Sequence, residues 1–239
     1  LFKKSSKSRK VRCEICANYC KIADGSYGIC KQHKNINGEL FDESFGVVSS
    51  LNADPIEKKP LYHFLPGTLT YSVGGFGCNM GCLHCQNYMI SQEFDKISDR
   101  FNILPETIVE NAINQGCKSI AWTYNEPTIH LPFNKKTSLL GRRKNLKIIY
   151  VSNGYMSDQS LSEILNFVDA FNIDLKSMSQ NFYKKICKAD LNIVLNNLKR
   201  IYDADKHLEI TNLLINGYND STEEITKLAN FIVDNLGCN

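Results

Sequence analysis

Three closely spaced cysteines are the residues of this sequence best able to do chemistry. They are Cys78, Cys82 and Cys85, in the run GCNMGCLHC that begins at Gly77. Three thiolates at this spacing can hold three corners of a cubane 4Fe–4S cluster, whereas clusters that only carry electrons normally have four cysteine ligands. No fourth cysteine follows nearby, so one iron would be open to another ligand. A zinc site with His84 as its fourth ligand is the alternative, because cysteine and histidine at short spacings also bind zinc.

A second cysteine group lies near the N-terminus, with the spacing C-x2-C-x3-C-x9-C. Its members are Cys13, Cys16, Cys20 and Cys30. Gly25 and Gly28 permit the tight turns of a metal knuckle, and Asn37-Gly38 predicts a hairpin turn. Four thiolates complete either a tetrahedral zinc shell or a saturated iron–sulfur cluster, and the sequence does not separate the two. We therefore predict a small cysteine-rich, metal-binding appendage with its linker over residues 13–66.

The composition is that of an ordinary globular protein, with 43% hydrophobic residues in a chain of 239. No apolar run approaches the roughly 20 residues of a membrane helix, and no secretory signal is recognisable. Seven of the ten cysteines fall in the two groups, which favours metal ligation in a reducing cytoplasm over disulfides. The other three, Cys117, Cys187 and Cys238, are interpreted as core or surface thiols.

The basic residues near the N-terminus form a run without acids. They are Lys3, Lys4, Lys7, Arg9, Lys10 and Arg12. The chain has 28 basic and 25 acidic residues, so its net positive charge belongs to this segment. We interpret residues 1–12 as a solvated leader and predict neither a nucleic-acid-binding nor a membrane-binding role for it.

The body of the chain alternates between strand and helix patterns. Strands are predicted over 68–75, 118–124, 147–152, 170–175 and 207–215, and helices over 105–116, from Ser157 onward, over 190–204 and from Ser221 to Gly237. Ser157 predicts a helix cap, and Ser221 with Glu224 predicts a capping box. Such alternation indicates an α/β fold with a parallel sheet, joined by right-handed crossovers, over residues 67–239.

Polar residues follow the ends of several predicted strands. They are Asn125, Glu126, Ser152, Asn153, Asp174, Lys176 and Asn212. The carboxyl ends of parallel strands meet at one rim, where the chemistry of such barrels gathers. We therefore expect these side chains to surround one site together with the cysteine loop.

Several motifs in a fixed order resemble those of one family. They are the N-terminal cysteine group, DPIEKKPLYHF from Asp54, GCNMGCLHCQN from Gly77, YNEPT from Tyr124, SNGY from Ser152 and DLK from Asp174. The chain resembles radical S-adenosylmethionine (SAM) enzymes, and more closely the radical SAM member of the AmmeMemoRadiSam system. That group is similar to pyruvate formate-lyase activating enzymes. The resemblance covers nearly everything after residue 12.

The resemblance implies a partial (β/α) barrel of the radical SAM type and roles for individual residues. The three clustered cysteines would ligate a 4Fe–4S cluster whose open iron binds SAM. Asn125 and Glu126 occupy the place of the motif that receives the SAM amino group. Ser152 and Asn153 lie where the methionyl and ribose parts are contacted, and Lys176 would pair with the SAM carboxylate. His84 would support the cluster without ligating it.

Two stretches depart from the family pattern. Residues 130–147 are interrupted by Pro132 and Gly141 and crowded with basic residues, so we expect a loop where the family has a helix. The chain also ends at Asn239, before the sixth strand that the resemblance implies. This predicts a C-terminally incomplete barrel.

The sequence favours an enzyme that cleaves SAM reductively and abstracts a hydrogen atom from an unidentified substrate. A low-potential donor such as a ferredoxin or flavodoxin would supply the electron. The first alternative is activation of a glycyl-radical partner protein. The others are a non-catalytic iron–sulfur or zinc protein and an inactive fragment of an active parent.

Overall fold

A six-stranded sheet forms the centre of the molecule, in a computed structural model that describes residues 2–4, 9–97 and 100–237. The strand order is β13-β12-β11-β10-β8-β7. Five strands are parallel: β8 (Leu69–Gly74), β10 (Ser119–Trp122), β11 (Lys147–Ser152), β12 (Ala170–Asp174) and β13 (His207–Thr211). The predicted parallel sheet is confirmed. Strand β7 (Ser50–Pro55) pairs antiparallel with β8 at one edge, within the stretch that sequence analysis assigned to the appendage and linker.

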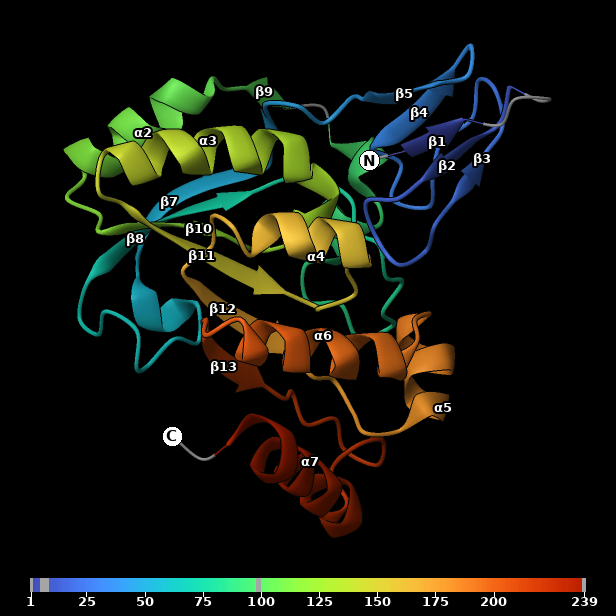
Figure 1. Cartoon of the computed structure of the whole chain (residues 1–239), viewed down its shortest axis with the longest axis vertical. Helices are drawn as coiled ribbons and strands as arrows, with labels where there is room; N and C mark the ends of the chain where they lie inside the picture. The colour runs from blue at the N-terminus through green and yellow to red at the C-terminus, as the bar shows by residue number, and fades with distance from the viewer. Residues whose placement is uncertain (1, 5–8, 98–99, 238–239) are drawn as a thin grey trace.

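Helices cover the convex face of this sheet (Figure 1). They are α2 (Pro105–Asn114), α3 (Leu131–Arg143), α4 (Asp158–Ile164) and α6 (Leu191–Asp203), while α7 (Thr222–Leu236) packs beyond α6. Apolar side chains at helical spacing, such as Val194, Leu198 and Ile201, face the sheet and are fully buried. The main core therefore lies between the sheet and these helices.

The opposite, concave face of the sheet carries a second, smaller core. Ala121, Ile149 and Ala170 pack there against Ile56 and Leu61. Ile56 belongs to the 3-10 turn η1 (Ile56–Lys58), which follows β7. The chain therefore fills the amino end of the curled sheet with its own residues and leaves the carboxyl end open.

Helix α3 corrects the prediction of a loop over residues 130–147. Pro132 lies in the first turn of this helix, where the missing N–H has no hydrogen bond to lose. A Cβ atom on Gly141 would lie 3.1 Å from Ile120 Cδ1, so the glycine lets the helix pack closely on the sheet. Ser138 accepts a 2.9 Å hydrogen bond from Trp122 Nε1. The buried face of α3 thus carries small and polar side chains. For this reason a search for apolar residues at helical spacing does not detect the helix.

Shorter elements surround the sheet. A three-stranded sheet joins β1 (Phe2–Lys4), β2 (Val11–Cys13) and β3 (Lys21–Ile22), and two pairs join β4 (His33–Ile36) to β5 (Glu39–Asp42) and β6 (Val47–Val48) to β9 (Phe101–Asn102). Short helical turns are α1 (Tyr88–Ser91), α5 (Gln180–Phe182), the 3-10 turns η2 (Phe94–Lys96) and η3 (Pro127–His130), and the π-helical turn η4 (Tyr183–Cys187).

The structure contains the predicted hairpin turn and gives part of the predicted leader a strand conformation. Asn37 and Gly38 have φ of 54° and 82° and join β4 to β5, which confirms the hairpin. Residues 1–12 were interpreted as a solvated leader; Phe2 and Lys3 are exposed, and Phe2–Lys4 forms strand β1, which pairs with β2. Lys7 and Cys238 lie outside the described residues.

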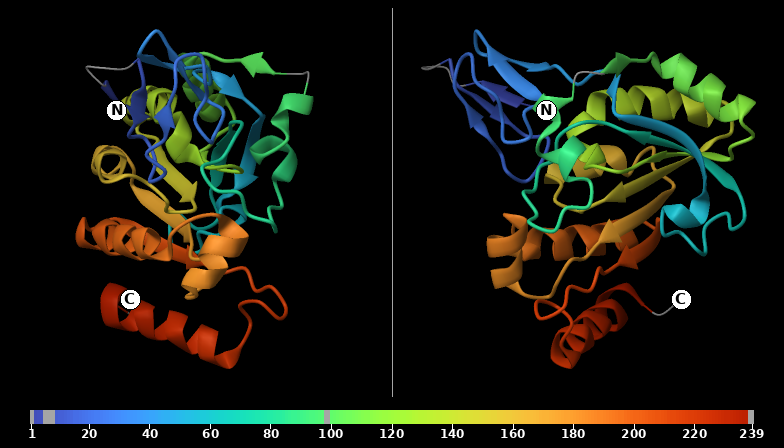
Figure 2. Two further views of the ribbon diagram at one scale, coloured as in Figure 1. Left: turned by 90° about the vertical axis from the view of Figure 1, so that its right-hand side faces the viewer. Right: turned by 180° about the vertical axis from the view of Figure 1, so that it is seen from behind.

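The N-terminal sheets lie against the carboxyl end of the central sheet (Figure 2). Ser157 Oγ donates to the Glu14 carbonyl oxygen at 2.6 Å, and Asn18 Nδ2 donates to the Asn79 carbonyl oxygen at 2.6 Å. Asn79 belongs to the cysteine loop, so the appendage contacts the segment that was predicted to carry the cluster.

The helix caps are confirmed in part. Ser157 accepts a hydrogen bond from Ser160 N at the start of α4, and Ser221 accepts one from Glu224 N at the start of α7. The reciprocal half of the predicted capping box is wrong, because the Glu224 carboxylate accepts instead from Ser177 Oγ and Met178 N. No helix in the described part of the chain is both long and apolar enough to pass through a membrane.

Replacing Ser157 by Ala should lower the free energy of unfolding by about 2–3 kcal/mol, because one hydroxyl both caps α4 and satisfies a buried carbonyl of the appendage. Ser221→Ala is the matched control, since it removes a cap alone and should cost about 1 kcal/mol. Urea unfolding measures both values. Equal losses in the two variants would show that the Ser157–Glu14 contact contributes nothing.

Candidate active site

The cysteine loop follows β8 and borders a cavity of about 500 Å³ at the open end of the sheet. All three predicted cluster ligands, Cys78, Cys82 and Cys85, line this cavity. Backbone hydrogen bonds fix the loop, since Gly81 N donates to Cys187 O and Leu83 N donates to Ile186 O, each at 3.0 Å. The π-helical turn η4 therefore holds the middle of the loop in place.

Two of the three thiols have partners that suit a metal-bound thiolate. Met80 N lies 3.5 Å and Asn153 Nδ2 3.7 Å from Cys78 Sγ, and both are donors. Burial raises the pKa of Cys78, so this thiol would ionise on binding a metal rather than before it. A hydrogen bond from Cys187 lowers the pKa of Cys82, and nearby Lys176 adds to the effect.

Cys187, interpreted from the sequence as a core or surface thiol, contacts the cysteine loop. Its thiol is fully buried, and its sulfur lies with Cys82 Sγ and a ring nitrogen of His84 in a trio of atoms within 4.8 Å of one another. The alternative zinc site would use His84 and all three loop cysteines. Among the described residues, however, this compact trio contains one loop cysteine, Cys82. Burial and the charge of Lys176 lower the pKa of His84. No local pattern around Cys187 could have indicated this contact.

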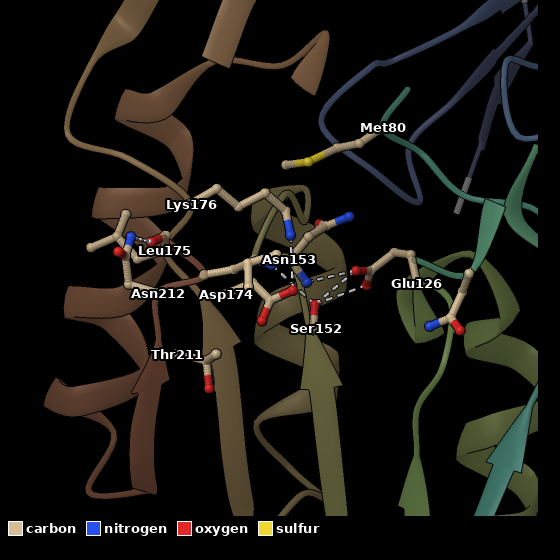
Figure 3. A network of polar contacts seen from close by, with 12 residues as sticks. Met80, Glu126, Ser152, Asn153, Asp174, Leu175, Lys176, Thr211 and Asn212 are labelled. Carbon is tan, nitrogen blue, oxygen red and sulfur yellow. Dashed lines mark hydrogen bonds and ion pairs between the residues drawn. The ribbon is translucent and has the colours of Figure 1, made fainter. Parts of the chain in front are cut away.

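The Glu126 carboxylate joins the ends of two neighbouring strands (Figure 3). It is 1% exposed and accepts from Thr128 N at 2.9 Å, from Thr128 Oγ1, from Ser152 Oγ at 2.9 Å and from Asn153 N at 2.9 Å. Burial raises the pKa of Glu126, and these hydrogen bonds oppose the rise. An approaching ammonium would share these oxygens with protein donors instead of meeting a free carboxylate.

The Asn125 side chain forms hydrogen bonds with the backbone at the start of the cysteine loop. Its Oδ1 accepts from Gly75 N at 3.0 Å, and its Nδ2 donates to Gly77 O at 2.8 Å. A Cβ atom on Gly75 would lie 2.4 Å from His130 Nε2, so glycine is required beside it. The predicted cofactor residue thus has both ends of its side-chain amide engaged in holding the loop entrance.

Asp174 at the end of β12 and Lys176 just after it line the same cavity, beside Ser152 and Asn153 (Figure 3). Lys176 Nζ is 2.8 Å from Asp174 Oδ2, so the ammonium already has an acidic partner. Burial disfavours the charge, yet Asp174 and Cys82 raise the pKa of Lys176. Asn212 follows β13 and donates to Leu175 O at 2.6 Å, so it supports the backbone of this wall.

The N-terminal cysteines lie close enough to influence one another's ionisation. Burial raises the pKa of Cys13 to about 11 and that of Cys30 to about 12, and repulsion by the neighbouring thiolates adds to both. Cys30 Sγ also lies 3.5 Å from His33 Nδ1, a buried side chain that sequence analysis did not consider. A cation at this site would stabilise the thiolates that burial disfavours.

Comparison with known proteins identifies the family. Residues 72–232 match the model of the radical SAM superfamily. The chain belongs to the radical SAM superfamily. Over 238 residues it is 42% identical to the uncharacterized protein MJ0808 of Methanocaldococcus jannaschii, covering 99% of this chain and 70% of that protein. MJ0674 of the same organism is 26% identical over 166 residues, 67% of this chain and 48% of the relative.

Two solved structures have a fold similar to that of this radical SAM protein. SuiB of Streptococcus suis, bound to S-adenosylmethionine, superposes with a TM-score of 0.53 at 14% identity, over 67% of this chain and 36% of SuiB. A structure of TYW1 with a lysine-pyruvate adduct gives 0.52 at 17% identity, over 78% of this chain and 72% of that chain. Proteins of the superfamily use a 4Fe–4S cluster and SAM. The narrower resemblance to the AmmeMemoRadiSam member stays a prediction.

The residues present fit these two cofactors. Three thiols border one cavity, donors point at the Cys78 sulfur, and the cavity volume lies in the range of small-molecule sites. The same cavity is lined by acceptors and donors from four strand ends, among them Glu126, Ser152, Asp174 and Thr211.

Replacing Asn153 by Ala should weaken cluster binding about 10–100-fold, the usual effect of losing a side chain that supports a metal ligand. The variant loses the contacts to Cys78 Sγ and to Asn79 Oδ1. Iron retained per chain during an anaerobic chelator challenge measures the effect. Asn166→Ala removes an exposed asparagine and is the control. Iron loss at the same rate in both variants would contradict the role of Asn153.

Proposed function

We propose that this chain binds a 4Fe–4S cluster through Cys78, Cys82 and Cys85 and SAM in the adjoining cavity, cleaves SAM reductively, and abstracts a hydrogen atom from its substrate. The supporting observation is the link between the cavity wall and the cluster loop. Asn153 is held by Glu126 on one side and reaches Cys78 and Asn79 on the other. Cofactor site and cluster loop are therefore parts of one rigid network.

Individual residues take roles that their positions support. Lys176 faces the cavity beside Cys82, where its ammonium can bind the SAM carboxylate by a charge-assisted hydrogen bond. Asp174 keeps that ammonium on the cavity wall. Ser152 and Asn153 contact the methionyl and ribose parts, while Asn125 and Glu126 shape the site for the amino group.

The cluster, when bound and reduced, supplies the electron that breaks the sulfonium bond of SAM. The chain contributes the ligands, the orientation of SAM and the exclusion of water. Its loop is fixed by η4 and Asn125, so the ligands are held before any cofactor arrives. A ferredoxin or flavodoxin in the cytoplasm would deliver the electron, and a protein substrate fits the proposal as well as a small molecule.

Anaerobically reconstituted protein should convert SAM to 5′-deoxyadenosine when dithionite is added, measured by chromatography. Cys82→Ala should abolish both the cluster absorbance and the product, because the variant lacks one of three ligands. Cys117→Ala removes a buried thiol away from the cavity lining and should keep both. A fully loaded cluster that yields no 5′-deoxyadenosine would leave an iron–sulfur protein without SAM chemistry and would overturn the proposal.

We also propose that Cys13, Cys16, Cys20 and Cys30 hold either a zinc ion or a second iron–sulfur cluster. Elemental analysis should find about four irons per chain plus one zinc, or roughly eight irons. Cys20→Ala should remove the zinc or the second set of irons, while the irons bound by Cys78, Cys82 and Cys85 persist. Unchanged metal content in this variant, with Cys117→Ala as control, would contradict a metal site here.

A further inference from the structure

The residues proposed to bind the cluster and SAM make up only part of the cavity lining, and a further part lies near the start of the sheet. That part comes from Lys58, Lys59 and Pro60, and Tyr124 lines the cavity beside Lys59. Lys58 ends the 3-10 turn η1 that follows β7, at the amino end of the curled sheet. Lys58, Lys59 and Pro60 therefore approach the cavity from its floor, whereas Tyr124 and the cysteine loop border it at the carboxyl end of the strands.

The floor is fixed at both edges of the sheet. Asn172 Nδ2 donates to Pro60 O at 3.0 Å, and Tyr62 N and His63 N each donate to the Glu209 carboxylate at 2.9 Å. Glu209 belongs to β13, at the edge opposite β7. The segment therefore crosses the sheet from one edge strand to the other, and its backbone is held in place along the way.

Lys59 is a buried cation with spare hydrogen-bonding capacity. Its side chain is 3% exposed, yet it lines the cavity. Nζ lies 3.0 Å from Asp54 Oδ2 and 4.5 Å from the centroid of the Tyr124 ring. An ammonium has three N–H donors, and Asp54 is its one acceptor among the described residues. The ammonium therefore has hydrogen-bonding capacity beyond Asp54, on the side not covered by the Tyr124 ring.

Asp54, Lys58 and Lys59 together carry more positive than negative charge. Asp54 serves two ammonium groups, since Lys58 Nζ lies 3.2 Å from Oδ1, and Tyr124 OH donates to Oδ2 at 2.9 Å. One carboxylate facing two ammonium groups leaves this corner with an excess of positive charge. The acids that line the cavity, Glu126 and Asp174, are already engaged elsewhere. Burial lowers the pKa of Lys59, and a bound anion would oppose that shift.

We propose that Lys59, assisted by Lys58, binds an anionic group of the substrate, a phosphate or a carboxylate, at the floor of the cavity. The inference rests on the proposed function for the presence of a substrate. A compact, fixed ammonium recognises such groups as a point charge. Lys176 occupies the wall beside Cys82, so the two cations can serve SAM and substrate separately.

Anaerobic titration calorimetry on the reconstituted full chain, with SAM present in excess, tests the site with three probes: inorganic phosphate, succinate and neutral glycerol. One of the two anions should bind and glycerol should not, and the anion that binds tells phosphate from carboxylate. Lys59→Met should weaken that binding at least about tenfold, and Lys58→Met about threefold. Lys144→Met, which removes an exposed lysine at the end of α3, should leave it unchanged.

A second variant separates lost binding from lost folding. Asp54→Asn combined with Lys59→Met removes both partners of the buried pair, so no uncompensated carboxylate is left facing a missing cation. Thermal unfolding should show that it is folded, and its anion binding should be as weak as that of Lys59→Met. Anion binding at the parental level in this folded variant would overturn the proposal, as would the absence of binding by both anions.

Two further outcomes assign a failure to its cause. If Lys59→Met weakens SAM binding instead of anion binding, Lys59 belongs to the cofactor site and the substrate subsite is wrong. If the parent protein binds an anion through Lys59 but forms no 5′-deoxyadenosine, the subsite stands as an anion site and the proposed function fails.

Discussion

The buried Glu126 carboxylate is the constraint on which the rest of the site depends. A carboxylate with almost no contact with water is costly unless donors surround it. Here they come from Thr128 on the same strand end and from Ser152 and Asn153 on the next strand. The ends of β10 and β11 are thereby held in one register. The Asn153 side chain, fixed from behind by this contact, points at the cysteine loop.

The same network extends to the appendage. The Asn79 side chain accepts a hydrogen bond from Asn153 and donates one to Tyr155 O. The Asn79 carbonyl accepts a third hydrogen bond, from Asn18. A Cβ atom on Gly77, whose φ is +81°, would lie 2.5 Å from Cys30 O. The N-terminal cysteine group therefore packs directly on the loop that carries Cys78. A shift in the backbone of one cysteine group would therefore reach the other.

The strands of the central sheet could be predicted because each is a short apolar run bounded by polar turn residues. The rim followed from them, since a parallel sheet brings its carboxyl ends together. The loop expected at α3 was wrong because Pro132 was counted as interior when it lies in the first turn. Cys187 and Lys59 could not be found in this way, because their partners Cys82 and Tyr124 are distant in sequence. Patterns in the sequence report the spacing of residues that lie close together in the chain. These contacts instead depend on where the floor segment and η4 lie in the folded protein.

The two lysines of the cavity form similar ion pairs in different electrostatic surroundings. Each has an acid nearby in sequence, Asp174 for Lys176 and Asp54 for Lys59. In the part of the chain that the structure describes, Asp174 pairs with one cation, whereas Asp54 is shared with Lys58 and with the hydroxyl of Tyr124. Because an acid divided among several donors compensates each of them less, the floor of the cavity stays the more electropositive end. A molecule entering with one anionic end would therefore be oriented with that end on the floor, and its remainder would extend toward the cysteine loop.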